Sequence, residues 1–301
     1  MYKYLVACII SIIVAVPGQA VQPEYKGYFS QDNDNTIVQK HLLSLSRETG
    51  AASSVGIVAG LGRYSELLRT ENTYSFQGRF KVEPAEYWSL AVQGGVLRYG
   101  SASLPLFSAA GVYEVPHAVR VEINAEHDVV DTLACLDDHT MASMLGAYAD
   151  VPLLEHFLLV GGGDVRAFSN GNNRFGLLGK AIVELPVDGL TLQVWHRQFR
   201  NSSENTVGYF NPATINFQRY VLSLKKRIYS ALRVTVIGGP GSQQVNTDTR
   251  TGTVYFEGRL EQNLASGLSF KINYIHSDSS IDNGLLSYKI NIWGATFLYA
   301  F

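Results

Sequence analysis

The chain has 301 residues, with 24 Lys and Arg against 26 Asp and Glu, so its formal net charge is −2 and only 17% of its residues are charged. This balance excludes a typical nucleic-acid-binding protein, which would carry a marked excess of base. Two cysteines, Cys8 and Cys135, provide no framework for a small disulfide-stapled domain.

Residues 1–20 have the features of a secretory signal peptide. Lys3 stands in a short basic start, an apolar run follows from Tyr4 to Val16, and Gly18 and Ala20 place small residues at the two positions that direct cleavage. Cleavage after Ala20 would remove Cys8. We therefore expect a signal peptide at 1–20 and one mature domain at 21–301.

Beyond residue 20, no segment approaches the ~18 to 20 continuous apolar residues of a transmembrane helix. Helical periodicity is nearly absent, whereas segments with a period of two recur about every 17 residues, which fits ~9 to 11 membrane-spanning residues plus a turn. About sixteen strands are predicted on this basis. Their ranges are 23–30, 37–48, 54–65, 73–83, 87–99, 103–114, 118–128, 141–150, 156–168, 173–185, 190–200, 216–227, 231–241, 252–262, 267–277 and 287–301.

Within these segments, apolar and charged side chains occupy opposite faces. Tyr74, Phe76 and Phe80, for example, alternate with Gln77 and Arg79. Sixteen strands enclose a wide, wet lumen, and Arg or Lys on a lipid-facing surface would cost ~2 to 4 kcal/mol. The pattern therefore predicts a transmembrane antiparallel up-and-down β-barrel whose charged rows face inward. The residues expected to line the lumen are Arg79, Lys81, Arg120, Glu122, Glu126, Asp164, Arg166, Arg174, Lys180, Glu184, Trp195, Arg197, Arg219, Tyr255, Glu257, Arg259, Glu261 and Lys271.

Short and long connections are expected to alternate between the two ends of the barrel. The short set includes 49–52, 115–117, 186–189 and 265–266, and the long set 129–140, 201–215, 243–251 and 278–286. Outer-membrane barrels have short periplasmic turns and longer external loops. An even strand number then predicts that both termini lie in the periplasm.

The final segment alternates aromatic and small residues and ends on Phe301. Trp293, Phe297, Tyr299 and Phe301 share one face. The segment resembles the terminal strand of bacterial outer-membrane barrels, which the barrel assembly machinery reads. Taken alone, it is also compatible with the last strand of a soluble sandwich.

A loop formed by Gly208, Tyr209, Phe210, Asn211 and Pro212 precedes a strand containing Arg219-Tyr220-Val221-Leu222. This sequence resembles the barrel domain of the bacterial exopolysaccharide export porins. These are the tetratricopeptide-plus-barrel proteins of cellulose and poly-N-acetylglucosamine secretion, together with their YaiO-like stand-alone relatives. Asn211 stands where that family usually has Ser, and no 34-residue helical repeat occurs in the chain.

The resemblance implies an outer-membrane porin of a diderm bacterium that serves as a passive conduit for exopolysaccharide. Expected partners are outer-membrane lipid, the barrel assembly machinery, a separate periplasmic tetratricopeptide-repeat protein and an inner-membrane polysaccharide synthase, with no nucleic acid. The alternatives are a general diffusion channel and a structural barrel without a polymer substrate.

One acidic loop leaves an enzymatic alternative open. The acidic and histidine side chains that cluster there are His127, Asp128, Asp131, Asp137, Asp138 and His139. Their spacing matches no metal site or hydrolase of known geometry. We expect no catalytic residue, metal or other cofactor.

Overall fold

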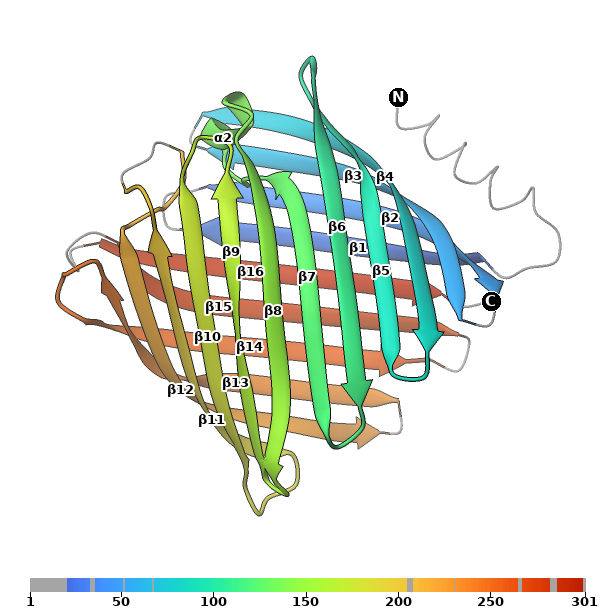
Figure 1. Ribbon diagram of the computed structural model, residues 1–301, viewed down its shortest axis with the longest axis vertical. Helices are drawn as coiled ribbons and strands as arrows, with labels where there is room; N and C mark the ends of the chain where they lie inside the picture. Colours follow the sequence, from blue (N-terminus) through green and yellow to red (C-terminus); the bar gives the residue numbers. More distant parts are fainter. Residues whose placement is uncertain are drawn as a thin grey trace.

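In a computed structural model, the chain forms one closed barrel of sixteen antiparallel strands, in which each strand pairs with its sequence neighbours and β16 pairs with β1. Figure 1 shows the barrel from the side, with β6 to β9 crossing the front wall. The structure describes residues 21–32, 36–50, 52–66, 68–204, 208–229, 231–264, 267–281 and 286–299. The predicted signal peptide and Phe301 lie outside these residues, so both assignments stay predictions.

The sixteen predicted strands are confirmed, and every observed strand overlaps its predicted range. The strands are β1 (Val21–Asp32), β2 (Ile37–Gly50), β3 (Ser53–Glu66), β4 (Arg69–Ala85), β5 (Trp88–Tyr99), β6 (Ala102–Val115), β7 (Val119–Val129), β8 (Met141–Leu154), β9 (Phe157–Phe168), β10 (Asn173–Glu184), β11 (Leu190–Asn201), β12 (Thr214–Tyr229), β13 (Leu232–Val245), β14 (Thr251–Asn263), β15 (Leu268–Ile281) and β16 (Leu286–Tyr299). One short helix, α2 (Leu133–Asp137), follows β7. No helix in the described part of the chain is long and apolar enough to cross a membrane.

The outer face of the barrel is apolar, as the alternation predicts. Phe76 on β4 is 56% exposed, whereas its neighbour Gln77 is 9% exposed and faces the interior. Ile123, Leu177 and Phe256 are exposed in the same way on β7, β10 and β14. Because no protein surface covers these side chains, they are placed to contact lipid hydrocarbon.

The two ends of the barrel differ in their connections. We call the end at which β1 begins and β16 finishes the terminal end. The opposite end, which carries residues 130–140, 202–204 and 208–213, is the loop end. Long connections do gather at the loop end, but the expected alternation is incomplete there. Glu66 pairs with Arg69 and Tyr99 with Ala102, so β3–β4 and β5–β6 turn tightly.

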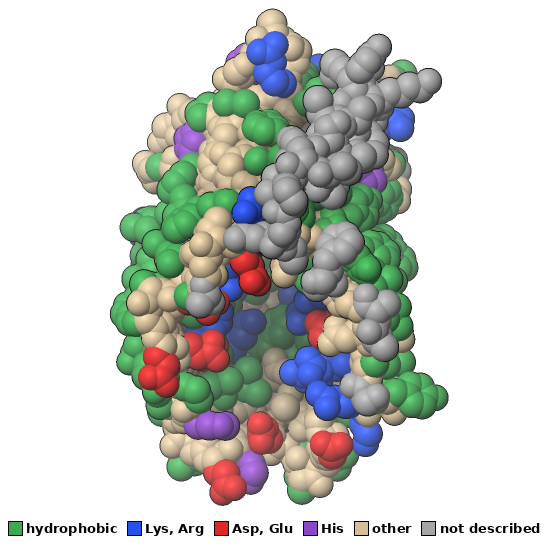
Figure 2. Space-filling model, turned by 90° about the vertical axis from the view of Figure 1, so that its right-hand side faces the viewer, with side chains coloured by type: hydrophobic (Ala, Val, Ile, Leu, Met, Phe, Trp, Pro, Cys, Tyr) green, Lys and Arg blue, Asp and Glu red, His purple; other side chains and the backbone are tan. Residues whose placement is uncertain are grey.

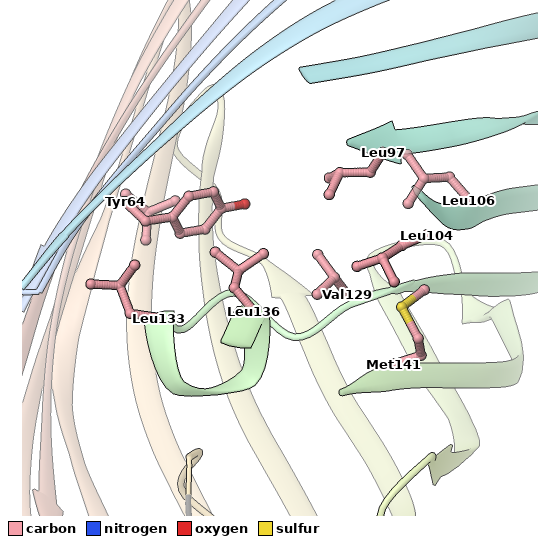
Figure 3. Packing of buried hydrophobic residues seen from close by; sticks show 9 residues of the cluster. Tyr64, Leu97, Leu104, Leu106, Val129, Leu133, Leu136 and Met141 are labelled. Carbon is pink, nitrogen blue, oxygen red and sulfur yellow. The ribbon is translucent and has the colours of Figure 1, made fainter. Parts of the chain in front are cut away.

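Residues 130–140 do not extend away from the barrel as a free loop. The side chains of Leu133 and Leu136 on α2 are 3% and 0% exposed. They pack on inward-facing residues of the adjacent wall (Figure 3). These wall and flanking residues are Val38, Tyr64, Leu97, Leu104, Leu106, Val129 and Met141. The long connection expected at 129–140 is present at the loop end, and it folds back over the lumen because its apolar side chains are buried against the wall. Its place outside the cell stays a prediction.

Candidate functional site

The candidate site is the polar interior of the barrel. Contacts that pass over intervening strands identify the concave side: Arg219 on β12 donates to Ser277 Oγ on β15 at 2.7 Å, and Arg79 on β4 pairs with Glu24 on β1 at 3.4 Å. Seen from the terminal end, the barrel has a hollow containing basic and acidic side chains, with apolar side chains on its flanks (Figure 2). The strand registers place all eighteen predicted lumen residues on the inward parity.

Half of the ten predicted basic residues in the lumen are paired with carboxylates. The partners are Glu24 for Arg79, Glu83 for Lys81, Glu122 for Arg120, Glu257 for Arg259, and Glu261 for Lys271. Glu257 is 3% exposed and also accepts a hydrogen bond from the Tyr255 hydroxyl at 2.7 Å. Three of these pairs lie two residues apart on one strand, Lys271 and Glu261 lie on the neighbouring strands β15 and β14, and Arg79 reaches from β4 to Glu24 on β1. The pairs neutralise one another along the wall, which is a structural role.

The other five basic residues lie together on β9 to β12, which we call the basic wall. Its members are Arg166, Arg174, Lys180, Arg197 and Arg219. Across the part of the chain that the structure describes, no carboxylate lies within ion-pair distance of any of them. The sequence predicted their inward direction, but it gave no indication that paired and unpaired cations would occupy separate walls.

Aromatic rings support three of these cations. The Arg174 guanidinium lies 4.6 Å from the Phe199 ring centroid, Lys180 Nζ lies 4.4 Å from Trp195, and the Arg219 guanidinium lies 4.8 Å from Tyr255. Trp195 and Tyr255 also meet edge to face, with centroids 5.3 Å apart. The rings hold the cations in place without neutralising their charge.

The Gly208–Pro212 motif is a folded element of the loop end. The Tyr209 ring stacks on Phe168 with centroids 4.6 Å apart, and its hydroxyl accepts a hydrogen bond from Asn172 Nδ2 at 3.1 Å. Arg174 Nη2 donates to the Phe210 carbonyl at 2.9 Å. The motif thereby connects the loop to β9, β10 and the basic wall.

Further amide contacts close this loop on itself. Asn201 Nδ2 donates to the Pro212 carbonyl at 2.5 Å, and Asn211 Nδ2 donates to the Ser203 carbonyl at 3.3 Å. Asn211 is 5% exposed, so it fills a buried position rather than presenting its side chain to the lumen.

The motif loop also contacts the loop that carries α2. Thr132 Oγ1 donates to the Gly208 carbonyl at 2.6 Å. Gly208 has φ +105, and a Cβ at this position would lie 3.0 Å from Cys135 Sγ, so both its backbone conformation and its surroundings favour glycine. The two longest described loops therefore meet and narrow the loop end of the lumen.

Polar contacts also dock the α2 loop on the wall against which its leucines pack. Asp131 Oδ2 accepts from Lys40 Nζ at 2.6 Å, and Asp131 Oδ1 accepts from the Tyr64 hydroxyl at 3.0 Å. Asp137 Oδ1 accepts from Arg69 Nη2 at 2.7 Å and from the Tyr99 hydroxyl at 2.6 Å. These wall residues cannot be identified from the sequence. The one feature that points to a docked loop is its pair of leucines, Leu133 and Leu136, among acidic residues.

The hydrogen bonds from Arg69, and then from Tyr99, lower the pKa of Asp137 to about 2. Because docking lowers the pKa of Asp137, its contribution to the stability of the docked loop is fully present above a pH of about 4. This contribution is lost as the pH falls from about 4 to about 2. In Arg69→Gln, we expect the Asp137 titration midpoint to rise towards 4. Carboxyl NMR titration, with Asp137→Asn assigning the signal, measures this. Arg98→Gln is the matched control, because Arg98 donates to Ser103 and not to Asp137; equal midpoints in both variants would contradict the docking contact.

No metal-binding group of three or more His, Cys, Asp or Glu side chains occurs among the residues that the structure describes. The acidic side chains of the α2 loop instead bind the wall or lie exposed. Cys135 is buried on α2, and burial raises the pKa of its thiol. Neither feature forms a recognisable catalytic arrangement.

Comparison with known proteins shows the fold. No family model matches the sequence, and no curated protein matches it. A solved "bacterial polysaccharide outer membrane secretin" superposes with a TM-score of 0.74 over 93% of this chain and 98% of that chain, at 10% identity. A variant of OccD1 (OprD) superposes with a TM-score of 0.51 at 10% identity, covering 95% and 96% of the two chains. Pseudomonas aeruginosa OpdQ gives 0.50 at 9% identity, covering 95% and 100%. The chain thus has the fold of outer-membrane β-barrels.

Proposed function

We propose that the protein is an outer-membrane channel of a diderm bacterium and a passive conduit for an exported polysaccharide. The observation that carries this proposal is a closed sixteen-strand barrel with an apolar exterior and a charged interior. Fixed charges of both signs keep a lumen hydrated, so a hydroxyl-rich chain can exchange weak contacts with water and wall as it moves. Energy for movement would come from polymer synthesis.

The polymer assignment has two supports. The Gly208–Pro212 loop resembles that of exopolysaccharide export porins, and the fold is similar to that of a polysaccharide outer-membrane secretin. In the proposed orientation, the terminal end faces the periplasm and the loop end faces the exterior, where the two folded loops control exit. A separate periplasmic repeat protein would deliver polymer from the synthase.

Deletion of the gene tests this function. In a strain that makes extracellular polysaccharide and has no second barrel able to substitute, we expect polymer to accumulate in the periplasm and to disappear from the medium. Restoring the wild-type gene should reverse both effects. Polymer is measured as sugar in the periplasmic and medium fractions.

Small-solute permeability distinguishes the alternative of a general diffusion channel. If deletion slows uptake of small sugars but leaves secreted polysaccharide unchanged, the export proposal fails and the diffusion channel stands. Unchanged secretion together with unchanged uptake would leave only the structural barrel.

A further inference from the structure

Arg166 and Arg174 are direct partners across the β9–β10 ladder. Like charges at directly opposed positions destabilise a sheet. This pair of guanidinium groups therefore lowers the stability of the barrel unless another interaction offsets the loss. Asp164 is the nearest carboxylate along β9, but it accepts a hydrogen bond from the Tyr148 hydroxyl at 3.4 Å and forms no ion pair within the described chain.

The two arginines are held in position while their charge stays available. Arg174 Nε donates to Asn201 Oδ1 at 2.9 Å, so its partners are neutral. Arg166 Nη2 contacts Met144 Sδ at 3.2 Å, a weak acceptor, and Arg166 Nε is buried without a hydrogen-bond partner. A buried donor without a partner is costly. An anionic ligand would supply both the missing acceptor and the missing negative charge.

These arginines line a cavity of about 320 Å³ beneath the two folded loops. Phe168, Tyr209 and Phe210 form part of its lining. Glu126, Asp128 and Asp131 line the same cavity. Asp131 is paired with Lys40, whereas Glu126 has no ion pair among the described residues. A ligand there would meet both cations and carboxylates, so a sugar ring could direct a carboxylate to the arginines and hydroxyl donors to the acids.

The basic wall continues from this cavity along the lumen. Arg174 and Lys180 are six residues apart on β10, which corresponds to about 20 Å at the rise of a β-strand. Arg197 and Arg219 lie on the next two strands, and Arg219 is paired in register with Trp195. Cations distributed over this length suit repeated negative charges on one chain better than a single small anion.

From this arrangement we propose that Arg166 and Arg174 bind the carboxylate of a uronic-acid residue, and that Lys180, Arg197 and Arg219 guide further carboxylates of the same chain. The subsite therefore specifies an acidic polysaccharide as cargo. This assignment rests on the proposed function, since it names the polymer class that the conduit accepts.

Current block in planar lipid bilayers tests the subsite with the intact protein. The probes are oligogalacturonate, a neutral malto-oligosaccharide of the same length, and monomeric galacturonate. For the wild type, oligogalacturonate should block ionic current at a concentration about tenfold or more below that of the neutral oligosaccharide, because charge-assisted hydrogen bonds contribute ~1.5 to 3 kcal/mol. High salt should weaken the block.

Arg166→Gln/Arg174→Gln should raise the half-blocking concentration of oligogalacturonate about tenfold, the loss expected for such bonds, and leave that of the neutral oligosaccharide unchanged. The matched control is Arg79→Gln/Arg120→Gln, which removes the same charge from cations that already have carboxylate partners. It should change acidic block much less. Heat-modifiable gel migration checks that each variant remains a folded barrel.

Each contrary outcome has a separate meaning. Equal block of the wild type by acidic and neutral oligosaccharides would overturn the acidic preference and leave the conduit standing. Equal effects of the two double variants, or monomeric galacturonate as effective as the oligomer, would overturn the proposed polymer subsite. Block by neither oligosaccharide would overturn the subsite and count against the conduit itself.

Discussion

Replacing Leu133 and Leu136 together by serine is expected to release the α2 loop and raise the single-channel conductance of the barrel. Both leucines are almost completely buried against the interior wall. Truncating a buried leucine lowers stability by ~2 to 5 kcal/mol. Since a five-residue helix is not stable alone, α2 depends on this packing to stay docked. Planar-bilayer recording measures the conductance.

The polar contacts of the same loop provide the matched comparison. Lys40 and Arg69 pair with Asp131 and Asp137, but their side chains are 28% and 47% exposed. Ion pairs of this kind contribute ~0 to 1 kcal/mol each. Lys40→Ala/Arg69→Ala should therefore raise conductance much less than the double leucine variant. If the leucine variant opens a site in 130–140 to protease and its conductance is unchanged, the docked loop does not limit flow.

Introducing arginine at Ile123 should lower the free energy of unfolding in lipid by ~2 to 4 kcal/mol, because its side chain points to the hydrocarbon near the middle of β7. Asn124 provides the same substitution one residue later, on the opposite face. There a new guanidinium would lie in the hydrated lumen between Glu122 and Glu126, and we expect a change of less than ~1 kcal/mol, as for an exposed ion pair.

Reversible urea unfolding in lipid vesicles measures both variants. Similar losses for Ile123→Arg and Asn124→Arg would contradict the inside–outside assignment of β7. An unchanged Ile123→Arg variant would show that this position does not contact hydrocarbon.

The barrel could be predicted from sequence because its main determinant is local. Phe76 and Gln77 face opposite sides whatever strands lie beside them, and this period of two repeats sixteen times. The packing of the loops at the loop end could not be predicted in the same way. Arg69 and Asp137 lie 68 residues apart, and no periodicity joins them.

The inward direction of the lumen residues was likewise local, whereas their partners were not. Arg79 and Arg174 read alike in the sequence, yet Arg79 pairs with Glu24 while Arg174 lies on Phe199. Which cations are paired depends on side-chain reach across a curved wall, and this becomes defined only when the barrel closes.

Closure itself joins the two ends of the described chain, since Tyr25 on β1 lies opposite Phe297 on β16. A pairing with this sequence separation forms late and carries a large loop-closure cost. Before it forms, two strand edges have unpaired N–H and C=O groups, which hydrocarbon cannot satisfy. A half-built wall therefore has no stable place in the bilayer, so membrane insertion and the joining of β1 to β16 must be coupled, or a catalyst must cover the open edges in the meantime.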